Sequence, residues 1–165
     1  MDKAELMIDP EEMRQAMQRW ATGVTVVTAE FEGVKHGMTV SSFISISLSP
    51  PRLLVSIQQA ARTHELVKRS GCFGVTILDE SQKEISERFA GQDAGGDRFR
   101  GLEVQTLSSG APLLASGLVR LDCRVALSHE IGEHTLFIGE VVAMQMGDKQ
   151  QPLIYFDRTY RRLVA

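Results

Sequence analysis

The sequence has few cysteines and no pattern typical of a structural metal site. Its two cysteines, Cys72 and Cys123, lie far apart in a chain of 165 residues, and each has apolar neighbours. Two cysteines without CxxC spacing argue against a zinc site, and isolated thiols among apolar residues indicate a reducing compartment rather than a disulfide. We therefore expect two buried free thiols and no bound metal.

Long apolar runs and a strong charge of one sign are also missing. No stretch approaches the roughly 18 apolar residues that a membrane-spanning helix needs. Residues 1–8 are charged and lack the apolar run of a signal peptide. The formal net charge is -3, and the basic residues are scattered apart from a short group at Arg158–Arg162. These features predict a cytoplasmic protein that binds neither membranes nor nucleic acid.

What is present is the composition of a globular protein. Charged residues make up 24% of the chain and hydrophobic residues 43%. A domain of this length buries about 70% of the surface that its unfolded chain exposes. Because no repeat, linker or change of composition divides the sequence, we expect one domain over residues 1–165, with residues 1–9 as a flexible N-terminus.

The stretch from Gly37 to Pro51 combines a strand pattern with many hydroxyl groups. Read with a period of two, it has an apolar face, Val40, Ile44, Ile46 and Leu48, and a hydroxyl face, Thr39, Ser41, Ser45 and Ser47. Hydroxyl groups both donate and accept hydrogen bonds, so the second face suits a ribityl chain, a phosphate or an amide-rich ring. An ordinary antiparallel strand with its polar face in water explains the same pattern.

The rest of the chain predicts a mainly β fold with a few short helices. We expect a helix after Asp9, whose apolar stripe from Met13 to Trp20 packs against the sheet, and further helices near residues 62–70 and after Asp79. Strand patterns cover residues 23–28, 37–49, 52–57, 73–78, 118–127, 134–143 and 152–156. Short strands joined by hairpin turns predict a closed or nearly closed antiparallel β-barrel.

Alternation in the strand over residues 118–127 predicts which of its side chains enter the core. The expected inward set is Leu121, Cys123, Val125 and Leu127, and the expected outward set is Arg120, Asp122 and Arg124. The charged side chains of this strand are therefore predicted to face water.

The start of the helix near residue 62 is a candidate anion site. A helix N-terminus presents unpaired amide groups, to which Thr63 adds a hydroxyl and Arg62 a cation, and together these suit a phosphate. A capped surface helix with a solvated arginine explains the same residues. The residues alone leave both interpretations open.

Groups for acid–base or nucleophilic catalysis are not evident. The sequence shows no Ser-His-Asp set, no carboxylate pair at a clear catalytic spacing and no GxGxxG fingerprint. His129 and His134 flank one turn, but two histidines are too few for a metal site. A cofactor that carries the electrons itself would require none of these groups.

Four motifs follow one another in a defined order. They are Ala21–Thr28, Gly37–Phe43 with Ser47–Pro51, Arg88–Gly91 and Gly132–Glu140. Over about residues 12–163, this order and spacing resemble the short-chain flavin reductases, small components that feed reduced flavin to two-component flavin-dependent monooxygenases. The resemblance implies an FMN-binding split β-barrel that forms a homodimer, binds FMN or FAD, and takes electrons from NADH or NADPH.

The resemblance also implies roles for single residues. The segment lining the isoalloxazine and ribityl groups is matched by Met38, Thr39, Val40, Ser41 and Ser42. The stretch beside the ribityl chain and phosphate is matched by Ser56, Ile57, Gln58, Arg62 and Thr63, and a further flavin contact by Arg88, Phe89 and Ala90. His134 falls on the catalytic histidine that approaches the nicotinamide, and Tyr160 on the aromatic residue near the pocket mouth.

Two departures from the family's pattern affect the site. Glu133 stands where the family commonly has aspartate in the turn before the histidine. The segment Gln58–Ala61 is less recognisable than the motifs around it, and FMN and FAD would be distinguished there.

Two other functions also fit the sequence. One is a split-barrel oxidase of the pyridoxamine phosphate oxidase type, which keeps FMN, oxidises an amine and needs a cationic site for the substrate phosphate. The other is a flavin-binding module without turnover. Consumption of NADH in the presence of added flavins separates these possibilities from a flavin reductase.

Overall fold

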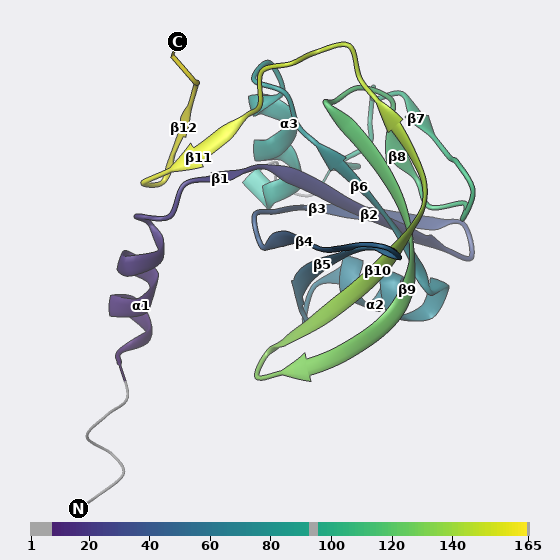
Figure 1. Ribbon diagram of the computed structural model, residues 1–165, viewed down its shortest axis with the longest axis horizontal. Helices are drawn as coiled ribbons and strands as arrows, with labels where there is room; N and C mark the ends of the chain where they lie inside the picture. Colours follow the sequence, from purple (N-terminus) through teal and green to yellow (C-terminus); the bar gives the residue numbers. More distant parts are fainter. Residues whose placement is uncertain (1–7, 93–95, 165) are drawn as a thin grey trace, which may run out of the picture.

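The computed structural model describes residues 8–92 and 96–164, which form a curled antiparallel sheet with helices at its rim (Figure 1). The sheet has seven strands in the order β3-β2-β6-β9-β10-β5-β4. Their bounds are β2 Thr25–Phe31, β3 Val34–Val40, β4 Phe43–Leu48, β5 Pro51–Gln58, β6 Cys72–Ile77, β9 Val119–Ile131 and β10 His134–Met146. The predicted mainly β fold with a nearly closed antiparallel barrel is confirmed.

The predicted long strand over residues 37–49 is two strands at opposite ends of the sheet. β3 and β4 meet only through Ser41 and Ser42, where the barrel is split. The Ser42 carbonyl accepts a hydrogen bond from the Ser56 amide at 3.2 Å, and the Ser42 hydroxyl donates to the Ser56 carbonyl at 2.9 Å. These bonds to β5 turn the chain from one end of the sheet to the other.

The shorter strands form two small sheets. β1 Thr22–Gly23, β11 Ile154–Phe156 and β12 Thr159–Arg161 make one, and β7 Val104–Gln105 and β8 Leu113–Leu114 make the other. The sequence pattern did not predict β12, because a strand of three residues is too short to show alternation. The tight turn between β11 and β12 has positive φ at Asp157 and Arg158, 49° and 60°.

Helix α1, Pro10–Met17, has the predicted capping box of Asp9 and Glu12. The prediction that its apolar stripe packs against the sheet is wrong. In the single chain, Met13, Met17 and Trp20 are 52%, 50% and 68% exposed. Figure 1 shows α1 standing apart from the barrel. Most of the N-terminus predicted to be flexible, residues 1–7, lies outside the described residues.

The other helices flank β3. Helix α2, Arg62–Ser70, ends at Gly71 in the left-handed conformation, as predicted. Helix α3, Lys83–Glu87, begins later than predicted because Asp79 accepts a hydrogen bond from the Ser81 amide in the preceding turn. It continues into a wider turn, η1 Arg88–Gln92. No helix in the described ranges is both long and apolar enough to cross a membrane.

The predicted outward direction of Arg120 and Asp122 on β9 is wrong. Both are buried, at 5% and 0% exposure, because the segment over residues 100–118 crosses that face of the sheet. Asp122 accepts hydrogen bonds from the amide and the hydroxyl of Ser109, and Arg120 donates to the carbonyls of Ala115 and Met146. Leu127, predicted inward, is exposed where β9 extends beyond the barrel.

Both faces of β2 are buried, and they belong to different core clusters. Val27 and Ala29 face a cluster beneath α2, with Phe73 and Phe137. Val24 and Val26 face a second cluster, lined by Phe89, Phe99, Leu114 and Leu153. Because the second cluster fixes η1 and the chain after β10 against the barrel, it also determines what lies beside β3.

Candidate functional site

β3 lies at one end of the sheet order, so one of its edges has no neighbouring strand among the described residues. The Gly37 carbonyl faces that open edge, where it accepts a hydrogen bond from Arg98 Nη1 at 2.8 Å. Backbone groups of a strand point to the same edge at every second residue. The amide and carbonyl of Thr39 are therefore directed to the open edge, where a ligand can reach them.

Side chains tie β3 to a helix on each of its faces. On one face, His36 Nδ1 lies 2.8 Å from the Thr63 hydroxyl at the start of α2. On the other face, the Thr39 hydroxyl donates to the Ser86 carbonyl of α3 at 2.6 Å. The open edge of β3 consequently runs between two fixed walls.

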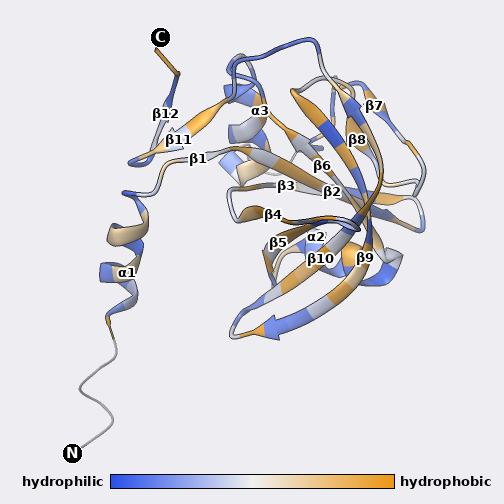
Figure 2. Cartoon of the chain, viewed as in Figure 1, coloured by the Kyte–Doolittle hydropathy of each residue, from blue (hydrophilic) through white to orange (hydrophobic). Residues whose placement is uncertain are grey.

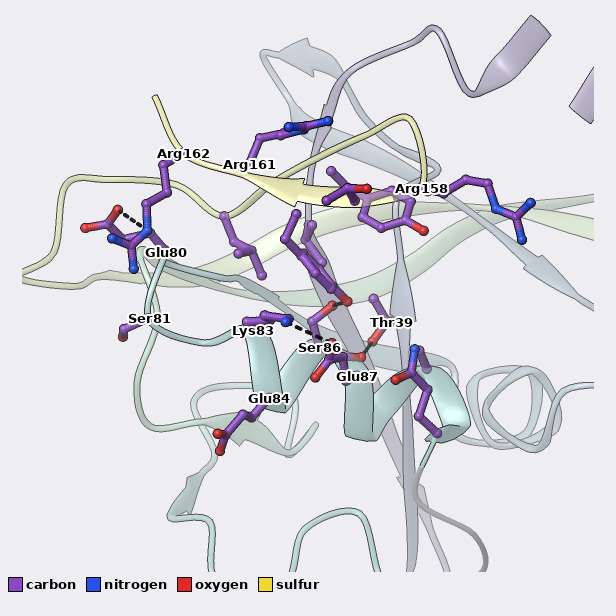
Figure 3. Close-up of a pocket in the computed structure, with 18 residues that line it drawn as sticks. Thr39, Glu80, Ser81, Lys83, Glu84, Ser86, Glu87, Arg158, Arg161 and Arg162 are labelled. Atoms are coloured by element: carbon purple, nitrogen blue, oxygen red, sulfur yellow. Dashed lines mark hydrogen bonds and ion pairs between the residues drawn. The ribbon is translucent and has the colours of Figure 1, made fainter. Parts of the chain in front are cut away.

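A cavity of about 730 Å³ opens where β3 ends, and we call it the hydroxyl cavity (Figure 3). Four residues of the predicted site line it: Thr39, Ser41, Ala90 and Tyr160. The hydroxyls of Ser86 and Tyr160 are 2.8 Å apart. Its volume is within the range of about 300–1,000 Å³ that is typical of small-molecule sites.

Seven charged side chains line the hydroxyl cavity, and four of them form ion pairs. Figure 3 shows the ion pairs Arg162–Glu80 and Lys83–Glu87, each with a nitrogen–oxygen distance of 3.5 Å. The lining also includes the hydroxyl-bearing residues Thr39, Ser41, Ser86 and Tyr160. Because hydroxyl groups both donate and accept hydrogen bonds, the cavity suits a polar ring system.

A second cavity of about 510 Å³ lies at the other end of β3, and we call it the basic cavity. Its charged lining consists of Lys35, His36, Arg62, Asp97 and Arg98. No side chain of the described residues caps the N-terminus of α2. The His64 amide donates to the Ala61 carbonyl at 3.0 Å, and the amides of Arg62 and Thr63 before it are available to an anion. This end of the site combines Lys35, Arg62 and Arg98 with the start of a helix.

A third cavity, of about 580 Å³, adjoins the hydroxyl cavity and shares Ser41, Tyr155 and Arg158 with it. Ser42, Phe43 and Trp20 also line it. The cavities thus place Ser41 and Ser42 between a polar and a more apolar surface.

Several predicted site residues have side chains that no ligand can touch without rearrangement. Val40, Ile57, Thr63 and Phe89 are buried at 4% exposure or less. Only their backbone groups can take part in binding. The Thr63 hydroxyl is in addition hydrogen-bonded to His36.

The remaining predicted residues lie on both sides of the split. Met38 packs against the core cluster beneath α2, Arg88 donates to the Arg100 carbonyl at 2.9 Å, and Ser56 bonds to Ser42. Gln58 pairs with His134 across β5 and β10. His134 is exposed at the start of β10, whereas Tyr160 is in the hydroxyl cavity, so one chain places these two residues in different surroundings.

Two histidines near α2 resist protonation. Burial, with smaller contributions from Arg98 and Arg62, lowers the pKa of His36 to about 4. Burial, with a smaller contribution from Lys68, also lowers the pKa of His64, whose Nε2 lies 2.8 Å from the Thr135 hydroxyl. Burial raises the pKa of the Cys123 thiol, and both cysteines are unpaired.

The lowered pKa of His36 predicts a loss of stability in mild acid. As the pH falls from about 6.5 to about 4, the unfolded chain binds a proton at His36 before the folded chain does, so folding becomes less favourable. Because His36 is only half-buried, we expect the free energy of unfolding to decrease by about 1 kcal/mol. This corresponds to about 2–4 °C in melting temperature. Melting curves of the wild type and of His36→Gln at pH 7 and pH 5 measure this contribution.

The expected result is a smaller acid-induced decrease in melting temperature for His36→Gln than for the wild type. His129→Gln removes an exposed histidine of β9 and serves as the matched control, with the full decrease. Equal decreases in His36→Gln and the wild type would show that His36 does not carry this dependence.

The fold defines a split barrel with a cavity at each end of the strand β3. The flavin reductase like domain matches residues 17–164, and the chain belongs to this family. The family resemblance predicted from the motifs is thereby confirmed.

Relatives and solved structures of the family match nearly the whole chain. The NADH-dependent flavin reductase StyB of Pseudomonas fluorescens is 40% identical over 93% of this chain and 89% of its own. The styrene monooxygenase flavin reductase of Pseudomonas putida is 38% identical, with a TM-score of 0.83 over 93% of this chain and 97% of that one. An NADH:FAD oxidoreductase of Streptomyces globisporus, solved with NAD and FAD fragments, is 31% identical, with a TM-score of 0.86 and 96% coverage of both chains.

The sequence predicted an anion site at Arg62 but not the other charged residues of the basic cavity. Lys35, His36 and Arg98 come from two distant parts of the chain, and none of them belongs to a recognisable motif. Ser86, which links Thr39 to Tyr160, was equally unremarkable in its predicted helix. A strand edge bordered by cations from separate segments leaves no periodic signal in a sequence.

Proposed function

We propose that this protein is an NADH:flavin oxidoreductase that reduces FMN or FAD and supplies the reduced flavin to a flavin-dependent monooxygenase. The observation that carries the proposal is the pairing of two cavities at the ends of β3. The hydroxyl cavity suits a polar ring, and the basic cavity suits a phosphate. Relatives named as NADH-dependent flavin reductases and as a monooxygenase component support the same function.

The donors along β3 match the groups of a flavin in order. The backbone of Thr39 and the hydroxyl of Ser41 lie at the ring end, and Arg62 and the first amides of α2 lie at the phosphate end. A bound flavin would supply the redox chemistry by accepting a hydride from the nicotinamide. The protein therefore needs to bind, orient and exclude water, and no acid–base pair is required.

The chain's own residues have separate tasks in this proposal. Thr39, held by its bond to Ser86, presents fixed donors to the ring, and preorganised donors stabilise negative charge that develops there. Tyr160 forms a wall of the hydroxyl cavity and, by its bond to Ser86, is held in place. His134, on the turn beside Gln58, is proposed to orient the nicotinamide by hydrogen bonding.

We further propose that the whole chain is one domain that works in the cytoplasm. The continuous seven-stranded sheet with a core on both faces of β2 supports a single domain. The two unpaired cysteines are typical of a reducing compartment, where NADH is also available.

The loss of NADH absorbance at 340 nm tests the function directly. The purified protein with NADH and either FMN or FAD is expected to oxidise NADH far above the rate of each mixture without protein. Substituting NADPH is expected to give a much lower rate. Rates at background with every flavin would rule out the proposed reaction.

We propose that the protein forms a homodimer through the outer face of β4. Ile44, Ile46 and Leu48, which belong to the apolar face of the strand pattern, are 58%, 48% and 89% exposed. Figure 2 shows β4 as an apolar strand at the end of the sheet. An exposed row of large aliphatic side chains is typical of a protein interface, and a second copy of the chain would cover it.

Replacing Ile46 by aspartate is expected to weaken this dimer at least 10-fold, because a charge would be buried without a partner. Light scattering after size exclusion, over a dilution series, measures the change. Val34→Asp replaces an exposed aliphatic residue of β3, 41% exposed, and is the matched control with an unchanged dimer. A dimer that survives Ile46→Asp undiminished places the interface elsewhere.

A further inference from the structure

We infer that Ser86 is a positioning residue of the hydroxyl cavity, and that its hydrogen bond to Tyr160 limits the rate at which a bound flavin leaves. The inference rests on the proposed function, because it concerns the release of the flavin that the same site takes. No pattern in the sequence distinguished Ser86 from the other residues of its helix.

Ser86 joins two walls of the hydroxyl cavity without being accessible itself. Its carbonyl accepts a hydrogen bond from the Thr39 hydroxyl at 2.6 Å, and its own hydroxyl lies 2.8 Å from that of Tyr160. Figure 3 shows Ser86 beside Thr39 in the lining of the cavity. Because Ser86 is 0% exposed, a ligand in the cavity meets Thr39 and Tyr160 instead. Ser86 therefore acts on a ligand through these two neighbours.

The two walls differ in how firmly they are attached to the barrel. Thr39 belongs to β3, which pairs with β2 along its whole length in the large sheet. Tyr160 belongs to β12, which pairs with β11 alone among the described strands. β11 in turn is joined to β1 through two residue pairs. β12 is thus the outer strand of a small sheet, and its side-chain contacts with the barrel decide where Tyr160 lies.

Few contacts hold the phenol end of Tyr160. Its ring packs against the second core cluster, and the Lys83 ammonium lies 5.9 Å from the ring centre. The edge-on contact with Tyr155, with ring centres 5.2 Å apart, lies within the same hairpin and does not fix Tyr160 relative to the barrel. Among the described residues, the bond to Ser86 is the only hydrogen bond between β12 and α3. The Ser86 hydroxyl therefore determines how closely Tyr160 is held to the wall formed by Thr39.

A ligand held between Thr39 and Tyr160 leaves more easily when the less firmly attached wall moves. That wall is Tyr160, and its movement away from α3 requires the bond to Ser86 to break. The bond is present while the ligand is held and absent when the wall has opened. Its removal should consequently raise the rate of release and change the rate of binding little.

Stopped-flow fluorescence of riboflavin tests the inference without relying on activity. Riboflavin has no phosphate, so its release depends on the ring and ribityl contacts alone. Tyr160→Phe keeps the ring and removes the hydroxyl, and we expect the dissociation rate to rise about 5-fold. This change corresponds to about 1 kcal/mol, the net contribution of one hydrogen bond. The association rate is expected to stay nearly unchanged.

Ser86→Ala removes the same bond from its other end and is expected to raise the dissociation rate equally. The double variant should release riboflavin no faster than either single variant, because a shared bond is lost only once. Ser116→Ala is the matched control. It removes a hydroxyl that accepts a hydrogen bond from Gln82 Nε2 at 3.0 Å, directly before α3 and outside the lining of the hydroxyl cavity. Its melting temperature should fall about as much as that of Ser86→Ala, with an unchanged dissociation rate.

An unchanged dissociation rate in Tyr160→Phe, additive effects in the double variant, or an equal increase in Ser116→Ala would overturn the inference. NADH oxidation by the same variants would then leave the proposed function intact. A wild type that binds no flavin would remove the proposed function, and the inference with it.

Discussion

Arg62→Ala is expected to weaken the binding of FMN and FAD about 10- to 100-fold and to leave riboflavin binding nearly unchanged. Arg62 is exposed in the lining of the basic cavity, and it makes no ion pair with another described residue. A hydrogen bond to a charged group contributes about 1.5–3 kcal/mol, and about 1.4 kcal/mol corresponds to a factor of ten. Riboflavin has no phosphate, so it measures the ring and ribityl contacts alone.

Arg69→Ala is the matched control for this experiment. Arg69 lies in the last turn of the same helix, where it pairs with Glu32 at 3.5 Å and stacks over Phe31. Its removal changes the net charge by the same amount, so any loss of flavin affinity from long-range charge alone would appear in both variants. If riboflavin binding fell as much as FMN binding in Arg62→Ala, the phosphate would not lie at this helix.

Asp122→Ala is expected to destabilise the protein by about 3 kcal/mol or more, because two hydrogen bonds to a buried carboxylate are lost. Asp122 is 0% exposed and accepts the Ser109 amide at 2.7 Å as well as the Ser109 hydroxyl. The substitution leaves both donors of Ser109 without this acceptor. For a chain of this size the melting temperature should fall by about 6–12 °C.

The loss of stability in Asp122→Ala is expected to involve more than the contact with Ser109, because Ser109 anchors the segment over residues 100–118. The same segment packs closely on β6, where a Cβ at Gly74 would come within 2.6 Å of the Pro112 carbonyl. Asp122→Asn keeps the volume and one acceptor, and it should cost about half as much. Arg124→Ala, at the next exposed position of β9, should lower the melting temperature little. Similar melting temperatures for all three variants would mean that the anchor lies elsewhere.

Alternation along β9 predicted its secondary structure and the burial of Cys123 correctly, but not that the opposite face is buried as well. The pattern of Leu121 and Cys123 against Arg120 and Asp122 assumes that one face of the strand meets water. The crossing segment covers that second face and satisfies the charged groups with backbone carbonyls and Ser109. The alternation of residues in one strand cannot predict that a segment from elsewhere in the chain covers that strand.

The hydroxyl-rich stretch around Ser41 shows the same limit at the site. The sequence indicated this stretch as a place where polar groups gather, and Thr39 and Ser41 line the hydroxyl cavity. The break between β3 and β4 was not predicted, although Ser42 and Phe43 interrupt the alternation where the chain turns to bond with Ser56. The apolar face of β4 is exposed.

By itself, the sequence determined most strands of the large sheet, the start and end of α2, and the family, because local periodicity, caps and ordered motifs are properties of neighbouring residues. Only the tertiary structure decided that Lys35, Arg62 and Arg98 share a cavity and that Thr39, Ser86 and Tyr160 share another. Curling the sheet brings these segments to the open edge of β3. Such proximity depends on how distant segments pack, which no pattern along the chain records.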